Sequence, residues 1–205
     1  NGTIDVAGSS GTLKIGATVT SLGTLDDALG TVWYDGGPVT IITDTYYNLR
    51  VSQANTKGTA GAINVNGTMT VDAGCTYDTE TYTTTVTGAS DINGTLTLSS
   101  GIYDANGAFD ATGGAVTFTG AGTLKIAGDA TSLGSFTKET DCTVEYDGSS
   151  QAVAQLDGSP SSESYYNLVI NGSGTKTLGG SSKIYGDLTL TAGDFDINGH
   201  TIYPK

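Results

Sequence analysis

The sequence predicts an all-β protein, either a right-handed parallel β-helix or a related β-solenoid, built from two tandem repeats. Two observations support this prediction. An ordered series of motifs recurs after 111 to 119 residues, and a finer pattern of turns and short alternating strands recurs inside it. Repeat architectures produce such series because each unit buries its apolar face against the next one.

The long repeat consists of four pairs of segments in the same order along the chain. The paired segments are Thr12–Ile15 with Thr123–Ile126, Thr20–Gly23 with Thr131–Gly134, Thr31–Gly36 with Thr143–Gly148, and Tyr46–Leu49 with Tyr165–Leu168. The growth of the offset from 111 to 119 residues indicates insertions in turns. We therefore expect one elongated domain over residues 1–205, with repeat units of about 1–105 and 106–205.

The finer repeat places a turn before alternating threonine and apolar residues. Its copies begin at Val65, Ile92 and Tyr185, and the first two lie 27 residues apart, about the length of one solenoid coil with three short strands. Asn-Gly suits a chain reversal because both residues tolerate positive φ. Alternation with period two predicts half-buried strands. The side chains expected to point inward are Met69, Val71, Leu96, Leu98, Leu188 and Leu190.

Strands are predicted along the whole chain, because short runs of Thr, Val, Ile and Tyr are separated by Gly, Asn, Asp and Ser. The helix candidate is Leu25–Leu29, which ends at Gly30 and spans at most a turn or two. An alternative fold is two β-sandwich domains of about 100 residues each, which also fits the long period. The 27-residue inner repeat favours the solenoid.

Composition and charge narrow the functional classes. The chain has 31 glycines but only 3 prolines, unlike collagen or Pro-rich disordered tracts. No apolar run approaches the roughly 18 residues of a membrane span. The formal charge is -13, from 21 acidic and 8 basic residues, with Arg50 as the sole arginine. Nucleic-acid binding needs basic patches, so we exclude nucleic acid as a partner.

The chain carries two cysteines, Cys75 and Cys142, without metal-ligand neighbours at a suitable spacing. They are either two buried free thiols or one disulfide, formed within the chain or between subunits. Each occurs in only one copy of the long repeat, which favours a specific pairing. The first residue is Asn1 rather than methionine, which indicates that a leader was removed or that the chain was trimmed.

Catalytic signals are sparse. The sole histidine, His200, lies five residues from the last one, and several aspartates precede glycine at turns, as in Asp35–Gly36 and Asp147–Gly148. We therefore expect no enzyme, with polysaccharide-acting activity as the least favoured reading. No cofactor is expected apart from a calcium candidate. Its ligands would be Asp194, Asp196 and Asn198, but the twelfth position of that loop is Lys205, so a strand and turn is favoured.

Exposed asparagines and aromatic residues are the remaining candidate sites. Glycosylation sequons occur at Asn1, Asn66, Asn93 and Asn171, although Asn-Gly turns before threonine produce them by chance. Trp33 corresponds to Glu145 in the second repeat copy, so it is expected to face outward, toward a subunit or glycan or under a covering loop. Strand alternation also places Tyr46 and Tyr165 on the outward face.

Three segments give the chain a family resemblance: Val144–Gln151, the two Tyr-Tyr-Asn-Leu motifs, and Gly174–Gly180. Over most of residues 11–205 the chain resembles Gly- and Thr-rich β-solenoid or adhesin-type repeats of large secreted microbial surface proteins. The resemblance implies a structural protein at an extracellular or cell-surface location, without catalytic residues. The first repeat departs from the pattern at Gly36–Pro38 and between Cys75 and Ser90.

The leading functional hypothesis is a structural subunit or segment of an extracellular filament, sheath or surface array. Copies of the chain would assemble head to tail, because the segment from Asn1 to Val6 continues the pattern with which Asn198–Ile202 stops. The alternative explanation of the same continuity is that the chain is one period of a longer polypeptide. The second hypothesis is an adhesin that binds glycans. A third is an ice-binding surface, suggested by Thr-x-Thr motifs that begin at Thr68, Thr95, Thr117 and Thr189.

Overall fold

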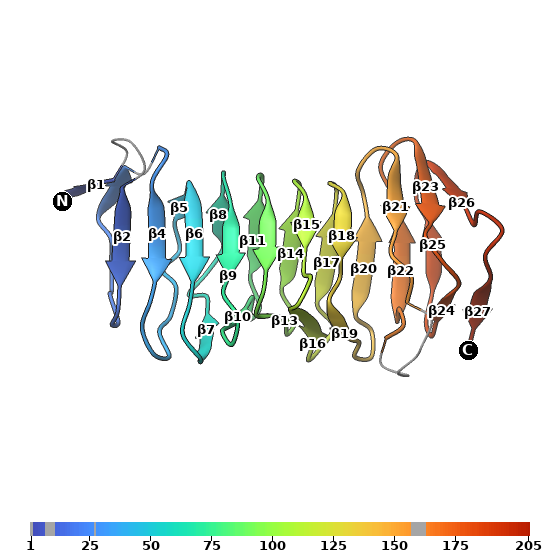
Figure 1. Cartoon of the computed structure of the whole chain (residues 1–205), viewed down its shortest axis with the longest axis horizontal. Coiled ribbons are helices and arrows are strands. Elements are labelled where there is room, and N and C mark those ends of the chain that lie inside the picture. Colours follow the sequence, from blue (N-terminus) through green and yellow to red (C-terminus); the bar gives the residue numbers. More distant parts are fainter. Residues whose placement is uncertain (1, 7–10, 27, 157–162) are drawn as a thin grey trace.

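The computed structural model describes residues 2–6, 11–26, 28–156 and 163–205. Within these residues the chain forms strands and turns without a helix. Short parallel strands stack into a rod of about ten turns, with β1 near one end and β27 near the other (Figure 1). The prediction of an all-β solenoid is confirmed, and the alternative of two β-sandwich domains is wrong.

Each coil has three sides, which the chain follows in the order I, II and III. Side I contains β2 (Thr12–Ile15), β4 (Thr31–Tyr34), β6 (Asn48–Val51), β9 (Met69–Val71), β12 (Ser90–Ile92), β15 (Phe109–Asp110), β18 (Ala130–Ser132), β21 (Gln151–Val153), β23 (Thr175–Leu178) and β26 (Asp194–Asp196). Side II contains β7 (Thr56–Gly58), β10 (Thr76–Asp78), β13 (Thr95–Leu98), β16 (Ala115–Phe118), β19 (Ser135–Thr137), β24 (Ser182–Ile184) and β27 (Ile202–Pro204). Side III contains β1 (Thr3–Asp5), β3 (Thr24–Asp26), β5 (Thr45–Tyr46), β8 (Ile63–Val65), β11 (Thr83–Val86), β14 (Ile102–Ala105), β17 (Thr123–Ile126), β20 (Thr143–Tyr146), β22 (Asn167–Ile170) and β25 (Leu188–Leu190).

One coil takes about 20 residues, so the expected coil length of 27 is wrong. Thr95 pairs with Thr76 on one neighbouring coil and with Ala115 on the other, 19 and 20 residues away. The 27-residue spacing covers one coil and one further side. The three turns of the finer repeat therefore lie at three different corners: Asn66–Gly67 before side I, Asn93–Gly94 before side II and Tyr185–Gly186 before side III.

The two copies of the long repeat also lie on different sides of the rod. Thr12–Ile15 forms β2 on side I, whereas Thr123–Ile126 forms β17 on side III. The separation between the two copies along the chain is therefore not a whole number of coils. Strands β14 and β15 follow one another in a continuous rod across residues 105 and 106, where the two units were expected to meet (Figure 1).

Glycine is required at these corners because neighbouring coils approach closely, whereas φ is not positive at Gly67 or Gly94. A Cβ atom on Gly67 would lie 2.5 Å from Asn48 Oδ1, and one on Gly94 would clash with the Cys75 carbonyl oxygen. Asn48 Oδ1 accepts a hydrogen bond from the Thr68 amide at 2.8 Å. The asparagine of one coil therefore supports the corner of the next coil.

The inward side chains of the interior coils form one continuous apolar core. Met69, Val71, Leu96 and Leu98 are fully buried in it, as the alternation predicts. In β25, Leu188 and Leu190 also point inward, in register with the buried Leu168 and Ile170, but they are 38% and 56% exposed. The reason is that β25 is the last strand of its sheet and no further coil covers its inward residues.

The helix expected at Leu25–Leu29 is replaced by a strand and a turn. Thr24–Asp26 forms β3, which pairs in register with β1, while Ala28 and Leu29 form a turn and Asp27 lies outside the described residues. Hydrogen bonds to the neighbouring coil override the weak helix propensity of such a short segment. The described part of the chain contains no helix that is long and apolar enough to cross a membrane.

Candidate interaction sites

Trp33 lies on the outer surface of side I, half-buried between two cationic side chains. Register pairing places Lys14 of β2 on one side of it and Arg50 of β6 on the other. Lys14 Nζ is 3.9 Å and Arg50 Cζ is 4.3 Å from the ring centroid. Cations at such distances are attracted to the electron-rich faces of an indole. The two residues therefore occupy the positions in which a ligand would stack on Trp33.

Polar neighbours hold this arrangement in place. Lys14 Nζ lies 2.7 Å from Asp35, and Arg50 forms three hydrogen bonds to Asp72, the shortest at 2.8 Å. Trp33 Nε1 donates to Ser52 Oγ at 2.6 Å, and Ser52 Oγ donates to Asp35 at 2.9 Å. The Lys14 ammonium, aided by Ser52, lowers the pKa of the Asp35 carboxyl. Each charge at the Trp33 site is thus neutralised by a partner within the chain.

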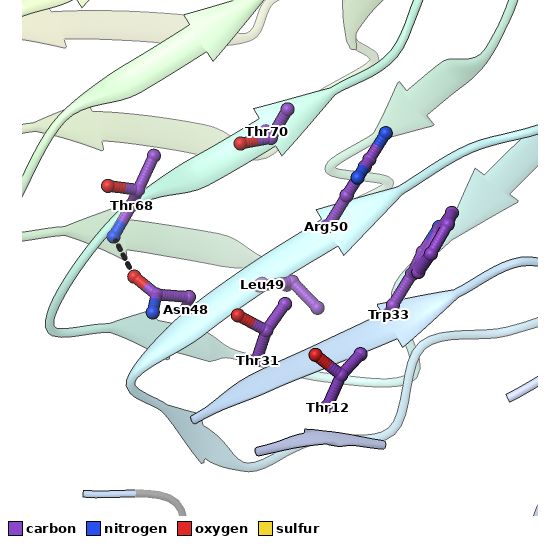
Figure 2. Close-up of a pocket in the computed structure, with 8 residues that line it drawn as sticks. All are labelled: Thr12, Thr31, Trp33, Asn48, Leu49, Arg50, Thr68 and Thr70. Carbon is purple, nitrogen blue, oxygen red and sulfur yellow. Dashed lines mark hydrogen bonds between the residues drawn. The ribbon is translucent and has the colours of Figure 1, made fainter. Parts of the chain in front are cut away.

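A shallow groove of about 390 Å³ runs across the strands beside Trp33. Figure 2 shows a row of threonines and Asn48 facing the row that contains Trp33 and Arg50. The lining residues are Thr12, Thr31, Trp33, Asn48, Leu49, Arg50, Thr68 and Thr70. Threonine hydroxyls donate and accept hydrogen bonds, so the groove could hold a flat polar ligand.

Tyr46 and Tyr165 are fully buried, so the prediction that they form an outward binding surface is wrong. Tyr46 ends β5 on side III, and Asn48 begins β6 on side I. A corner of the solenoid therefore separates the two residues. The alternation read across the Tyr-Tyr-Asn-Leu motif changes phase at this corner, and its first tyrosine points into the core.

The buried tyrosines form the same hydrogen-bonded pair in both copies of the long repeat. In the first copy, Tyr46 Oη lies 3.1 Å from Tyr34 Oη and donates to the Ile42 carbonyl at 2.6 Å. In the second copy, Tyr165 Oη lies 3.1 Å from Tyr146 Oη and donates to the Ala154 carbonyl at 2.6 Å. In each pair the other tyrosine accepts the loop amide, at 3.2 and 3.0 Å. The recurring tyrosines therefore anchor a loop against the core.

Cys75 and Cys142 are both buried free thiols, so the structure contradicts a disulfide between them within the chain. Cys75 precedes β10, and Cys142 precedes β20 on another side of the rod. Strand β10, which follows Cys75, lies three coils along the rod from β19, which precedes Cys142. Three coils span about 14 Å, well beyond the roughly 7 Å limit for disulfide-bonded Cα atoms. Burial raises the pKa of both thiols, which lowers their reactivity.

The calcium candidate forms a strand and a turn. Asp194 and Asp196 are exposed residues of β26, and Asp196 Oδ1 accepts a hydrogen bond from the Asn198 amide at 2.8 Å. Asn198 has a left-handed φ of 49°, as expected of asparagine in a tight turn. Among the described residues, no group of three or more His, Cys, Asp or Glu is placed to hold a metal ion.

The sequons occupy corners with different accessibility. Asn66 and Asn93 are exposed, whereas Asn1 lies outside the described residues. Asn171 is half-buried, since its Nδ2 donates to Glu145 at 2.7 Å and its Oδ1 accepts from the Gly172 amide at 2.8 Å. The two exposed asparagines are therefore the accessible sequons of the described chain.

Two buried lysines were not singled out by the sequence analysis. Lys57 donates to the Gln53 carbonyl at 3.4 Å, and Lys176 donates to the carbonyls of Gly148 and Ser173 at 2.9 and 2.8 Å. Desolvation lowers the pKa of Lys176. The alternation Thr-Lys-Thr-Leu in β23 puts Lys176 in phase with the inward Leu178, which was the available signal.

The last coil exposes apolar side chains that interior coils bury. Besides Leu188 and Leu190, Ile197 and Tyr203 are 46% and 52% exposed. Among the described residues, strands β25, β26 and β27 each form the edge of their sheet, so one row of their backbone groups has no neighbouring strand there. Such an edge readily pairs with another strand.

Comparison of the chain with protein-family models, with curated proteins and with solved structures finds no match. We therefore infer its function from the geometry of the rod and of its surfaces.

Proposed function

We propose that the chain is a structural rod that assembles head to tail with copies of itself in an extracellular filament, sheath or surface array. The observation that carries this proposal is the contrast between Leu96 and Leu98, which are fully buried, and Leu188 and Leu190, which are 38% and 56% exposed. All four leucines point inward along the solenoid. The leucines of the last coil would gain the same burial if another coil covered them.

The first strand of a second copy continues the order of the sides. The chain leaves side II at β27, the next side in the order is III, and β1 lies on side III. Stacked on β25, β1 would place Ile4 and Val6 over Leu188 and Leu190. In this register the parallel ladder passes from one copy to the next at the usual strand spacing of about 4.8 Å.

Side I supports the same register. Stacking β2 on β26 would place Leu13 over Phe195, which are both partly buried against the core. The adjacent outward residues are then Lys14 and Asp196, which carry opposite charges. Opposite charges directly across a strand pair are favourable. A head-to-tail contact of this kind does not close on itself and therefore propagates into a filament.

A double variant with Leu188→Lys and Leu190→Lys tests the proposal. Two charges on the end face would prevent stacking, while the interior coils keep their contacts. We expect the unmodified chain to form rods that lengthen with concentration in light scattering and electron microscopy, and the variant to remain monomeric. Tyr82→Lys is the matched control, because Tyr82 is 40% exposed at a corner in the middle of the rod. A chain that stays monomeric at high concentration would overturn the proposal.

Glycan binding is the second candidate function, favoured by the hydroxyl-lined groove beside Trp33 (Figure 2). Lys14 and Arg50 already occupy the two faces of the Trp33 ring, so a sugar would have to bind along the threonine row. Titration with neutral oligosaccharides, followed by Trp33 fluorescence, tests this function. Saturable binding lost in Thr31→Val would support it, and an unchanged spectrum would count against it.

Ice binding and catalysis find less support. The Thr-x-Thr motifs that begin at Thr68, Thr95, Thr117 and Thr189 lie on three different sides and do not form one lattice. The extracellular or cell-surface location rests on the resemblance to secreted microbial repeat proteins. We assign no catalytic role to the chain.

A further inference from the structure

Two rows of side chains run along the rod on the outer surface of side I, and residues of both rows line the groove of about 390 Å³ (Figure 2). In the first row, the residues that face one another on successive coils are Thr12, Thr31, Asn48 and Thr68. In the second row, two residues further along each strand, they are Lys14, Trp33, Arg50 and Thr70. Neighbouring members of a row are one coil apart, about 4.8 Å. The first row therefore presents polar groups at a regular spacing along the rod axis.

The threonine hydroxyls of the groove are available to a ligand. Within the described part of the chain, the hydroxyls of Thr12, Thr31, Thr68 and Thr70 form no hydrogen bond to the protein. Asn48 differs, because its Oδ1 accepts from the Thr68 amide at 2.8 Å and its Nδ2 donates to a backbone carbonyl at 3.2 Å. Asn48 therefore holds the row in register, while each threonine offers one donor and two acceptor lone pairs.

The other side of the groove is apolar and carries no net charge. The Trp33 indole has one polar atom, Nε1, which donates to Ser52 Oγ at 2.6 Å, so the ring presents carbon to the groove. Lys14 and Arg50 each form an ion pair with an aspartate. A row of hydroxyls opposite an apolar wall suits an uncharged sugar, whose hydroxyls meet the threonines and whose C–H groups meet the ring.

The second copy of the long repeat carries the same row on side III without the aromatic wall. Its facing residues are Thr123, Thr143 and Asn167. Thr143 is the counterpart of Thr31, and Glu145 stands where the first copy has Trp33. The Glu145 carboxylate accepts a hydrogen bond from Asn171 Nδ2 at 2.7 Å. The second copy therefore supplies a matched control for the groove.

The spacing of the first row selects the shape of a sugar chain. In an extended β-1,4-linked chain of pyranoses each sugar advances by a distance close to one coil step, whereas an α-1,4-linked chain curves away from a straight line. The row covers the four coils that contain β2, β4, β6 and β9. It ends at Ala89 on the next coil, which has no hydroxyl. About four sugars in a straight line therefore fit the row.

We propose that this groove binds an uncharged β-1,4-linked glycan that lies along the rod axis, with one sugar against each coil. Thr12, Thr31 and Thr68 form hydrogen bonds to its hydroxyls, and Trp33 contacts its C–H groups. The proposal rests on glycan binding, the second candidate function, and is independent of head-to-tail assembly. It adds the linkage, the direction and the length of the bound segment.

Titration with cello-oligosaccharides, at concentrations where the rods stay dispersed, tests the length and the linkage. Trp33 is the sole tryptophan, so its fluorescence reports on the groove directly. We expect affinity to rise from cellobiose to cellotetraose and to change little for cellohexaose, because the row ends after four coils. Maltotetraose, the α-1,4-linked isomer of cellotetraose, should bind at least about tenfold more weakly, since its curved chain meets fewer threonines. Added salt should leave the affinity unchanged, because the ligand is uncharged.

Thr68→Val removes the last hydroxyl of the row and keeps the β-branched shape. It should weaken cellotetraose binding by about three- to tenfold and leave cellotriose, which fits the other three coils, nearly unaffected. Thr143→Val is the matched control on side III and should leave both affinities unchanged. Equal affinities for cellotetraose and maltotetraose, or an equal loss in Thr143→Val, would overturn this binding mode, although glycan binding itself would stand. If no oligosaccharide binds saturably, glycan binding fails as well, and head-to-tail assembly is unaffected.

Discussion

The interior coils and the last coil use the same sequence pattern with opposite results for burial. Leu96 and Leu98 in β13 are fully buried, whereas Leu188 and Leu190 in β25 are 38% and 56% exposed. Both strands alternate leucine with threonine and present the leucines inward. Inward direction in a solenoid is therefore set by alternation, but burial is supplied by the coils stacked on either side.

The difference shows where the rod is stable and where it can bind. The strands of an interior coil form backbone hydrogen bonds with neighbouring strands on both edges. Among the described residues, β25, β26 and β27 have a neighbouring strand on one edge only. In repeat proteins stability is close to a sum over units and nearest-neighbour interfaces. The last described coil has a neighbour on one side only, and we expect it to open before the interior wherever no further coil stacks on it.

The largest difference in stability between the interior coils and the last coil is expected at alkaline pH, because the buried tyrosines lie in the interior coils. Burial raises the pKa of six of them: Tyr34, Tyr46, Tyr77, Tyr103, Tyr146 and Tyr165. The native state thus holds protons that the unfolded state releases above about pH 10. This contribution to stability is complete below that pH and is lost as pH rises above it.

Phenolate absorbance and circular dichroism, followed together against pH, measure this effect. We expect the six buried phenols to ionise only as the rod unfolds. Ionisation of all eleven tyrosines while the strands remain intact would show that the interior coils are not packed as described.

A leucine truncation compares the interior and the last coil directly. Leu124 is fully buried, with Tyr103 and Val144 opposite it on the two adjacent coils. Leu124→Ala should lower the free energy of unfolding by about 2–5 kcal/mol, the usual cost of a core cavity. Leu190→Ala should cost the dispersed chain less than about 1 kcal/mol, because its side chain is 56% exposed. Urea denaturation of both variants measures the two losses of unfolding free energy. Equal losses would contradict the proposed difference in stability between the interior coils and the last coil.

The tyrosine pairs allow a comparison of the two repeat copies. Tyr165→Phe removes the donor to the Ala154 carbonyl, and Tyr46→Phe removes the equivalent donor to the Ile42 carbonyl. Each change should destabilise the chain by about 1–3 kcal/mol, because a part-buried carbonyl and the buried hydroxyl of the paired tyrosine both lose a hydrogen-bond partner. Tyr203→Phe, in the exposed last coil, should have almost no effect. Unequal losses in the two copies would show that the pairs have different roles.

The smallest effect is expected on the outer surface of side I. Arg50→Gln removes one of the two cations that cover Trp33 and its ion pair with Asp72. We expect a loss of about 0.5–1 kcal/mol in stability and stronger quenching of Trp33 fluorescence by acrylamide. Lys183→Gln is the control, since it lies at another corner. If Trp33 quenching does not change, Arg50 does not cover the ring in solution.

The sequence predicted the solenoid and the inward residues of its interior coils because both depend on local alternation. It also indicated that Trp33 faces outward, from the equivalence with Glu145. Other features depend on where the chain turns a corner. The 27-residue spacing was misleading because similar turns serve all three corners, and Tyr46 was misplaced because a corner lies just before Asn48.

Features formed by stacking could not be predicted from one sequence. Lys138, Lys183 and Lys205 lie far apart along the chain, and only the coil register gathers them around Tyr185. The exposure of Leu190 likewise depends on the absence of a neighbouring coil and not on its own segment.

Disulfide trapping of the joint tests the central claim, that one rod continues into the next, most directly. In the proposed register Asp5 of one copy lies opposite Thr189 of another, at a Cα separation of about 4.8 Å, which a disulfide can bridge. A chain with Asp5→Cys and Thr189→Cys cannot close on itself, since about ten turns separate the two positions. The native cysteines are buried. The matched control pairs Asp26→Cys with Thr189→Cys, because Asp26 lies one coil further on, about 9.6 Å away.

The measurement is the length distribution of oxidised chains on a non-reducing denaturing gel. A head-to-tail filament predicts a ladder of covalent dimers, trimers and longer species from the Asp5→Cys, Thr189→Cys chain, and monomers from the Asp26→Cys control. Monomers from both chains, or equal ladders from both, would contradict the proposed continuation of the solenoid from one copy to the next.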